Sequence, residues 1–445
     1  MNTITASADL SAPAARARLS AAWVSRIVML GATSIVVGIL WDISWHRTIG
    51  RDTFWTPAHL AIQLGGLLGG FISGWLVLST TFRGTAAEKS AAVKLWGFRG
   101  PIGAWVTIWG CLAMLISAPF DNWWHDAYGL DVKILSPPHT VLALGMWAVV
   151  LGALLLVLRE QNNGAPASST ARTDSSAKDF PQIQEGHRLS ASSAASLNQR
   201  EEKKWWNPAA PAGSETGAPS RWLFVFGNGV LLAMASVFLT EYSFPNQQHT
   251  APFYLASSVI FPLYLVGIAR AAKFRWSATL TALGYMLIVA IMAWILPLFP
   301  GEPKLGPIAN RVDHFVPLPF PLLLVVPAFA IDLIRNFIGA GQRWWRDVLI
   351  VVLSAVAFVA LFSVTQWYFS KFLLSEYGQN WFFAADRHWG YTESPGEWRT
   401  KFWDSKTSRN EPTATLSTFA LALACALGSS ALGLLLGNWM AKVRR

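Results

Sequence analysis

Asp42, His46 and His59 are three potential metal ligands that lie between the end of one long apolar segment and the start of the next. Asp42 and His46 are four residues apart, so on a helix their side chains share one face. His59 follows Pro57, a residue that suits the first turn of a helix. One carboxylate and two imidazoles can bind a single cation, and this ligand set suits copper, zinc or non-haem iron. The spacing therefore predicts a metal site at a membrane boundary.

A second copy of this pattern lies 79 to 80 residues further along the chain, with Asp121, His125 and His139 as its ligands. The matching stretches are Asp42-Ile43-Ser44-Trp45-His46 with Asp121-Asn122-Trp123-Trp124-His125, and Thr56-Pro57-Ala58-His59 with Ser136-Pro137-Pro138-His139. A period that contains two apolar segments indicates a duplicated helix–loop–helix unit, and its second copy strengthens the metal hypothesis. The alternative interpretation is a pair of structural Asp–His hydrogen bonds that hold each loop in place.

The composition is that of a membrane protein. Of the 445 residues, 53 % are hydrophobic and only 13 % are charged, and the 24 tryptophans favour segment ends, where aromatic belts form. The net charge of +10 is explained by basic residues that set membrane orientation, which we prefer to nucleic-acid binding. The two cysteines, Cys111 and Cys425, lie in apolar segments, so neither a disulfide framework nor a thiol catalyst is indicated.

The apolar segments predict an all-α fold, a polytopic integral membrane bundle of about ten transmembrane helices. The expected spans are 21–41, 58–81, 101–119, 138–158, 221–240, 252–271, 276–298, 318–338, 347–369 and 414–440. Prolines at 317, 319, 321 and 327 make the eighth span the one expected to be broken or kinked. The expected units are a disordered cytoplasmic tail (1–20), a four-helix membrane domain with both metal motifs (21–158), a flexible cytoplasmic linker (159–220), and a six-helix membrane domain (221–445) with an outer loop (370–412).

Basic residues cluster in alternate loops and predict the orientation. They are Arg83, Lys89, Lys94 and Arg99; Arg270, Lys273 and Arg275; Arg335, Arg343 and Arg346; and Lys442, Arg444 and Arg445. All of them fall on one side if both termini are cytoplasmic, as the positive-inside rule requires. The sequence therefore predicts an inner (plasma) membrane protein with both metal motifs toward the periplasmic side.

Further ionisable residues in the C-terminal half have no assigned role. Asp332 lies within an expected span and is a functional candidate, although an interhelical contact, for example to nearby Arg335, explains it equally well. His249, Asp313 and His314 lie in expected outer loops, where a histidine is more often solvated or hydrogen-bonded than a metal ligand.

Asp52 and Asp131 are candidate acceptors that could orient a ligand imidazole from outside the first coordination sphere. Either aspartate could instead pair with a nearby loop arginine, Arg47 or Arg51.

The two phrases resemble the C-type subunit of the copper-containing membrane monooxygenases, the particulate methane and ammonia monooxygenase superfamily. The first site of that family has the form Asp-x3-His-x12-His, which Asp42, His46 and His59 match. The second has the form Asn-x3-His-x13-His, and this chain has Asp121 in place of the asparagine, which adds a negative charge. The resemblance covers about residues 20–160, whereas residues 221–440 match no other component of that family.

The resemblance implies copper rather than iron or zinc, with Asp42, His46 and His59 as catalytic ligands. It also implies partner subunits, an electron donor and an oligomeric assembly in the lipid bilayer. The leading hypothesis is a copper-dependent monooxygenase component that uses dioxygen to hydroxylate a small apolar or ammonia-like molecule. The alternative is a membrane protein that binds and handles periplasmic copper without oxygen chemistry, and a third interpretation is a non-catalytic scaffold.

Overall fold

The computed structural model describes residues 11–51, 53, 55–129, 136–163, 218–272, 274–339, 344–403 and 412–444. The described chain is mostly helical. Its α-helices are α1 (Ser11–Thr48), α2 (Pro57–Arg83), α3 (Ala86–Ala91), α4 (Ile102–Tyr128), α5 (Pro137–Asn163), α6 (Ala218–Ser236), α7 (Ala251–Ala271), α8 (Ser277–Ile295), α9 (Val325–Ile338), α10 (Trp344–Leu374) and α11 (Leu416–Met440). Short 3-10 helices cover Val237–Tyr242, Pro245–Gln247, Leu296–Leu298 and Glu397–Thr400.

The two described strands, β1 (Val93–Leu95) and β2 (Phe98–Gly100), form an antiparallel hairpin between α3 and α4. Its two-residue turn is Trp96-Gly97, and both residues adopt positive φ, 48° and 89°. A turn with two positive φ angles matches the right-handed twist of paired strands. The connection between α2 and α4 consists of α3 and this hairpin.

Within the described residues, nine helices are long and apolar enough to cross a membrane: α1, α2, α4, α5, α6, α7, α8, α10 and α11. This confirms a polytopic, all-α membrane protein. The one expected span without a full-length helix is 318–338, the span predicted to be broken or kinked, where the helix α9 covers only Val325–Ile338, 14 residues. At 1.5 Å per residue such a helix is roughly 21 Å long, which is too short for a bilayer core of about 30 Å. Pro317, Pro319 and Pro321 precede it and keep the backbone extended.

Several boundaries differ from the expected units. α1 begins at Ser11, inside the segment expected to be a tail, where four of the residues 11–20 are alanines that favour helix. α5 continues to Asn163 and α10 to Leu374, so both helices extend beyond their expected spans. Most of the expected linker, 164–217, lies outside the described residues, as does 404–411 of the expected outer loop.

Helix pairs approach closely through glycines. α1 packs on α2, α4 on α5, and α7 on α11. A Cβ at Gly31 would lie 2.7 Å from the carbonyl oxygen of Gly65, and one at Gly110 would lie 2.7 Å from that of Gly145. Small residues that let two backbones meet are typical of helix pairs in membranes. The two helices that carry each ligand group, α1 with α2 and α4 with α5, are therefore tightly paired.

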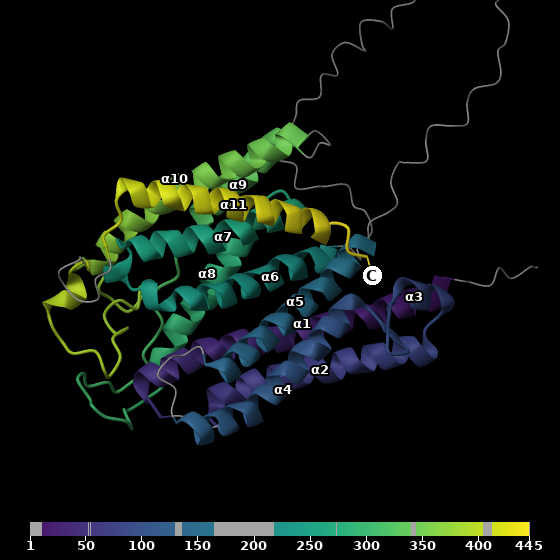
Figure 1. Ribbon diagram of the computed structural model, residues 1–445, viewed down its shortest axis with the longest axis horizontal. Helices are drawn as coiled ribbons and strands as arrows, with labels where there is room; N and C mark the ends of the chain where they lie inside the picture. The colour runs from purple at the N-terminus through teal and green to yellow at the C-terminus, as the bar shows by residue number, and fades with distance from the viewer. Residues whose placement is uncertain are drawn as a thin grey trace, which may run out of the picture.

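Different segments of the chain lie at the two ends of the helix bundle. In Figure 1, α3 and the beginning of α1 lie at the right, at the same end as the C-terminus. The segments that follow α8 and α10 lie at the opposite end, where the backbone of Lys304 donates to the carbonyl of Ile49, just after α1 ends. We refer to the end that holds the last turn of α1 as the ligand end.

Candidate metal centre

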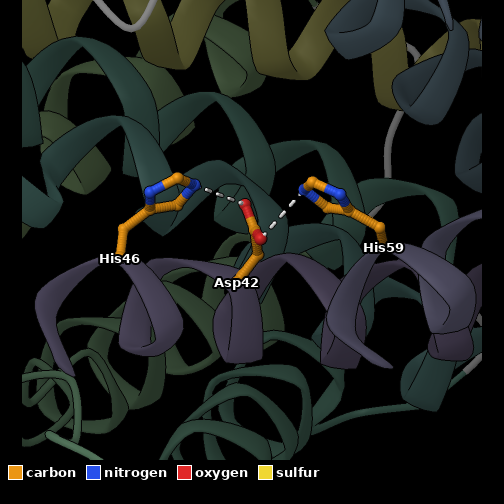
Figure 2. Close-up of side chains that lie close together, drawn as sticks. All are labelled: Asp42, His46 and His59. Carbon is orange, nitrogen blue, oxygen red and sulfur yellow. Dashed lines mark ion pairs between the residues drawn. The ribbon is translucent and has the colours of Figure 1, made fainter. Parts of the chain in front are cut away.

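The first ligand group is built where α1 ends and α2 begins. Asp42 and His46 lie one turn apart near the end of α1, and His59 lies in the first turn of α2, two residues after Pro57. Proline at the first helical position removes no hydrogen bond, because that N–H has no partner inside the helix. Figure 2 shows the Asp42 carboxylate between the two imidazoles, which extend from the two helices toward it.

The three side chains lie close enough to share one ion. Asp42 Oδ2 is 3.8 Å from His46 Nε2, and Asp42 Oδ1 is 3.1 Å from His59 Nε2. One ligand atom from each residue can be chosen so that all three lie within 4.8 Å of one another. Two atoms that bind one ion at about 2 Å lie roughly 3 to 4 Å apart. Both carboxylate–imidazole separations match that range.

A contact at the other ring nitrogen of His59 fixes which tautomer the neutral ring adopts. His59 Nδ1 lies 2.9 Å from the carbonyl oxygen of Thr53, and because a carbonyl can only accept, Nδ1 carries the proton and donates. In the neutral ring Nε2 then presents a lone pair toward Asp42 Oδ1. That oxygen is buried and has no hydrogen-bond partner among the described residues. Two lone pairs at this distance repel each other unless a proton or a cation lies between them, so the arrangement fits a bound cation.

The second ligand group has the same construction at the end of α4 and the start of α5. Asp121 Oδ1 lies 3.5 Å from both His125 Nε2 and His139 Nε2. His125 Nδ1 lies 3.1 Å from the carbonyl oxygen of Gly129, which fixes the tautomer as in the first group. Asp121 Oδ1 is also buried and lacks a hydrogen-bond partner among the described residues. Each copy of the sequence pattern therefore brings one aspartate and two histidines close together.

The first group is the more compact of the two. Among the described residues, only Asp42, His46 and His59 offer three ligand atoms that all lie within 4.8 Å of one another. In the second group the carboxylate is close to both imidazoles, but the set as a whole is more open. Binding at the first group therefore requires less rearrangement.

The expected orienting residues of the imidazoles are not tested by the described part of the chain. Asp52 and Asp131 lie outside the described residues. The acceptors that the structure describes are the backbone carbonyls of Thr53 and Gly129. A backbone acceptor can belong to any residue type, so composition carries no signal for it. The sequence signal for these acceptors was their position in the chain, because Thr53 and Gly129 both lie in the segment that joins the two helices of their site.

Asp332 has a structural role. The side chain is fully buried, and its carboxylate accepts hydrogen bonds from the backbone N–H groups of Ala278 and Thr279 and from the Thr279 hydroxyl. It therefore caps the first turn of α8 from α9 and satisfies donors that the helix itself cannot. Arg335 donates to the carbonyls of Ala272 and Phe274. The interhelical-contact interpretation holds, with the start of α8 as the main partner.

His249, His314 and His388 lie apart from both ligand groups in local contacts of their own. His249 is sandwiched between the rings of Trp367 and Phe402, at centroid distances of 3.5 and 3.6 Å. His314 Nδ1 pairs with Asp313 Oδ1 at 2.7 Å, so these neighbours bind each other. His388 is buried, and its Nδ1 donates to the carbonyl of Ala384.

Burial of His249 and His388 predicts acid sensitivity. Loss of water lowers the pKa of His249 to about 4, and burial, followed by the charges of Arg47 and Arg399, lowers the pKa of His388 to about 3. Between these values and the unfolded value near 6.5, the unfolded chain binds more protons, so stability rises with pH and falls on acidification. The expected loss for His249 at pH 4 is on the order of 3 kcal/mol.

Thermal unfolding of detergent-solubilised, chelator-treated protein between pH 7 and 4.5 measures this effect. A His249→Phe variant keeps an aromatic ring in the stack but cannot be protonated, so its melting temperature is expected to fall less steeply below pH 6.5. Parallel curves for the variant and the natural chain would contradict the assignment.

Fold and site together define a class: a helical, membrane-embedded protein with two Asp–His–His groups near the ends of two helix pairs. Comparisons with protein-family models, with curated proteins and with solved structures find no match to the chain.

Proposed function

We propose that this chain is a copper-dependent membrane monooxygenase component, similar to the C-type subunit, that hydroxylates a small apolar or ammonia-like molecule with dioxygen. The observation that carries the proposal is the buried Asp42 carboxylate oxygen, 3.1 Å from Nε2 of His59 and without a hydrogen bond among the described residues. Thr53 accepts the Nδ1 proton of His59, so in the neutral ring Nε2 is a donor atom directed at the ion that Asp42 would share.

The donor set suits copper. Two imidazole nitrogens and one carboxylate form a mixed site in which Cu(II) stands high in the affinity order of divalent metals. Asp42 supplies the negative charge, and His46 and His59 supply neutral nitrogen donors from two different helices. Three protein ligands leave a position open for a small molecule, which distinguishes catalytic sites from closed structural ones. When bound there and reduced, copper would supply the activation of dioxygen.

An apolar groove runs along the helices that carry the ligands. It has a volume of about 210 Å³ and lies between α2 and α4. Gln63, one turn after His59, lines it, as does Leu115, six residues before Asp121. Its other lining residues are Gly66, Leu67, Gly70, Phe71, Ile108, Cys111, Leu112 and Met114. Leu67, Phe71, Leu112 and Leu115 of its lining are exposed, so in a bilayer the groove is open to the lipid tails, from which a small apolar substrate would arrive.

The reaction needs components beyond this chain. Hydroxylation of R–H consumes one dioxygen, two electrons and two protons, and yields R–OH and water, so an electron donor must deliver both electrons. No haem, flavin or iron–sulfur motif is recognised in the sequence. We therefore propose partner subunits of the monooxygenase type and an oligomeric assembly.

The proposed orientation places the ligand end on the periplasmic side. The basic loop that holds Arg83, Lys89 and Lys94 includes α3, which lies at the opposite end of the bundle, together with the C-terminus (Figure 1). Loops rich in lysine and arginine face the cytoplasm.

Copper handling without oxygen chemistry is the second candidate. It is favoured by the openness of the ligands, because the side chain of His46 is 47 % exposed and that of His139 is 39 % exposed. Accessible ligands allow a metal ion to be exchanged with a carrier. Against it stands the scarcity of soft sulfur ligands, since the chain has eight methionines and transport of Cu(I) commonly recruits sulfur.

Copper-loaded, detergent-purified protein tests the proposal. We expect about one copper per intact ligand group, and incorporation of one atom of labelled dioxygen into ammonia or a short alkane when a chemical reductant is present. Copper binding without a dioxygen-dependent product would favour copper handling. Stoichiometric zinc, or no metal after incubation with copper, would reject both candidates.

A further inference from the structure

The C-terminal half of the chain holds the end of α1 directly beside a metal ligand. Arg47 follows His46, and its guanidinium donates to the carbonyl of Pro317 at 3.3 Å and to the carbonyl of His388. It also pairs with the Glu393 carboxylate at 3.5 Å. The ring of Phe244 lies under the guanidinium, 4.6 Å away. A side chain from the first membrane-spanning helix thus joins segments some 270 to 346 residues away.

Backbone contacts continue on the following residues. The N–H of Tyr391 donates to the carbonyl of Arg47 at 3.1 Å, and the N–H of Val316 donates to the Thr48 hydroxyl at 2.8 Å. The N–H of Lys304 donates to the carbonyl of Ile49 at 2.9 Å. We define these contacts of residues 47–49 with 304, 316, 317, 388, 391 and 393 as the clasp. It supplies partners for carbonyls that a helix end leaves without one.

The residue before His46 is fixed as well. The ring of Trp45 packs on Phe315 at a centroid distance of 5.6 Å, and its Nε1 donates to the carbonyl of Arg51 at 2.9 Å. His46 therefore lies between two residues whose side chains are both held by parts of the chain outside α1. Its own side chain is the more exposed of the two imidazoles at this site, at 47 % against 27 % for His59. The backbone turn that carries His46 sets where its imidazole can lie relative to Asp42, 3.8 Å away.

The second ligand group lacks the key side chain of the clasp. The residue after His125 is Asp126, where the first phrase has Arg47, and Asp126 accepts a hydrogen bond from Asn122 one turn earlier in α4. α4 packs mainly on α5 and α2, and Figure 1 places it along the edge of the bundle away from α10 and α11. This difference parallels the greater compactness of the first group among the described residues.

We propose that Arg47 is a positioning residue of the first metal site, and that through the clasp the C-terminal half of the chain sets the affinity of that site. The inference rests on the proposed metal function but goes beyond it, because it assigns a role to residues that the resemblance leaves unmatched. The clasp fixes the last turn of α1, and the turn fixes His46 relative to Asp42 and His59. Without the clasp, the last turn would fray and His46 would have to be ordered when metal binds.

Copper titration of the metal-free, detergent-solubilised full chain tests the clasp. A His125→Ala background isolates the first site, and a His46→Ala background isolates the second. Arg47→Met keeps the length of the side chain but removes its donors, and we expect it to weaken Cu(II) binding at the first site by about 10- to 100-fold, as loss of an outer partner of a ligand does. Binding at the second site should not change. Arg387→Met is the matched control, because Arg387 lies in the same region and pairs with its neighbour Asp386.

Electron paramagnetic resonance distinguishes a positioning role of Arg47 from a purely structural one, because only a positioning role changes the Cu(II) spectrum of the first site. The Cu(II) spectrum of the first site is expected to broaden in Arg47→Met and to recover partly in Arg47→Lys, which can keep one carbonyl contact. If Arg47→Met does not fold, Glu393→Gln keeps the arginine and removes its carboxylate partner, and it should give an intermediate loss of affinity.

Unchanged affinity at the first site in both Arg47→Met and Glu393→Gln would overturn the inference. An equal loss at both sites would also overturn it, because it would mean general destabilisation. Failure of the natural chain to bind copper would overturn the inference together with the proposed function. A selective loss at the first site, in a protein that yields no product with dioxygen, would support the clasp and reject only the oxygenase.

Discussion

Replacement of His59 by alanine is expected to reduce bound copper from about two ions per chain to about one. His59 is the only ligand of the first group that α2 supplies, and its Nε2 lies 3.1 Å from the buried Asp42 oxygen. Without it, two ligands on one helix turn remain. The loss of affinity should exceed the roughly 10- to 100-fold that removal of an outer partner costs. Metal analysis of dialysed protein and quantitative spin counting of Cu(II) measure the effect.

His314→Ala is the control for this experiment. His314 lies after α8 in the same half of the chain as the clasp, pairs with Asp313, and belongs to neither ligand group. Its loss should leave the copper content unchanged. The second ion retained in His59→Ala also reports that the bundle is still folded. Full copper content in the His59 variant would remove this residue from the site and leave a salt bridge as the better explanation.

The site was predictable from the sequence because its geometry is local. Four residues separate Asp42 from His46, and helical periodicity alone places them on one face. Pro57 marks the beginning of the next helix and so predicted that His59 lies in its first turn. The orienting carbonyl of Thr53 and the contact of Arg47 with Glu393 were not predictable in this way. The first depends on loop conformation, and the second joins residues that are remote in sequence.

Hydropathy predicted nine of the spans because a bilayer demands about 20 apolar residues regardless of which helices are neighbours. The exception, 318–338, shows the limit of that reasoning. Most of its residues are apolar, but the prolines before α9 remove backbone donors and prevent a continuous helix. The extended segment instead reaches the end of α1, where Pro317 accepts from Arg47. The prolines predicted the break in this helix. They did not predict which part of the chain the extended segment contacts.

The position of His59 relative to Asp42 depends on how closely α1 and α2 approach. Gly38 lies one turn before Asp42, and a Cβ built on it would lie 2.9 Å from the backbone nitrogen of Ile62 and 3.1 Å from the carbonyl oxygen of Ala58. These are backbone atoms of α2 next to His59, so they cannot move without moving the ligand. The absence of a side chain at Gly38 therefore brings the two halves of the first ligand group together.

Replacement of Gly38 by leucine is accordingly expected to abolish copper binding at the first site and to retain it at the second. The leucine must push α2 away from α1 at Ala58, which separates His59 from Asp42, and overpacking of this kind costs about 1 to 3 kcal/mol of stability. Copper content and the melting temperature in detergent measure both effects. Gly74→Leu is the matched control on α2, because a Cβ at Gly74 meets no atom within 4 Å. If Gly38→Leu keeps the first copper while the control behaves as expected, the separation of the helices does not govern the site, and His59 must reach the metal from a position set by its own loop.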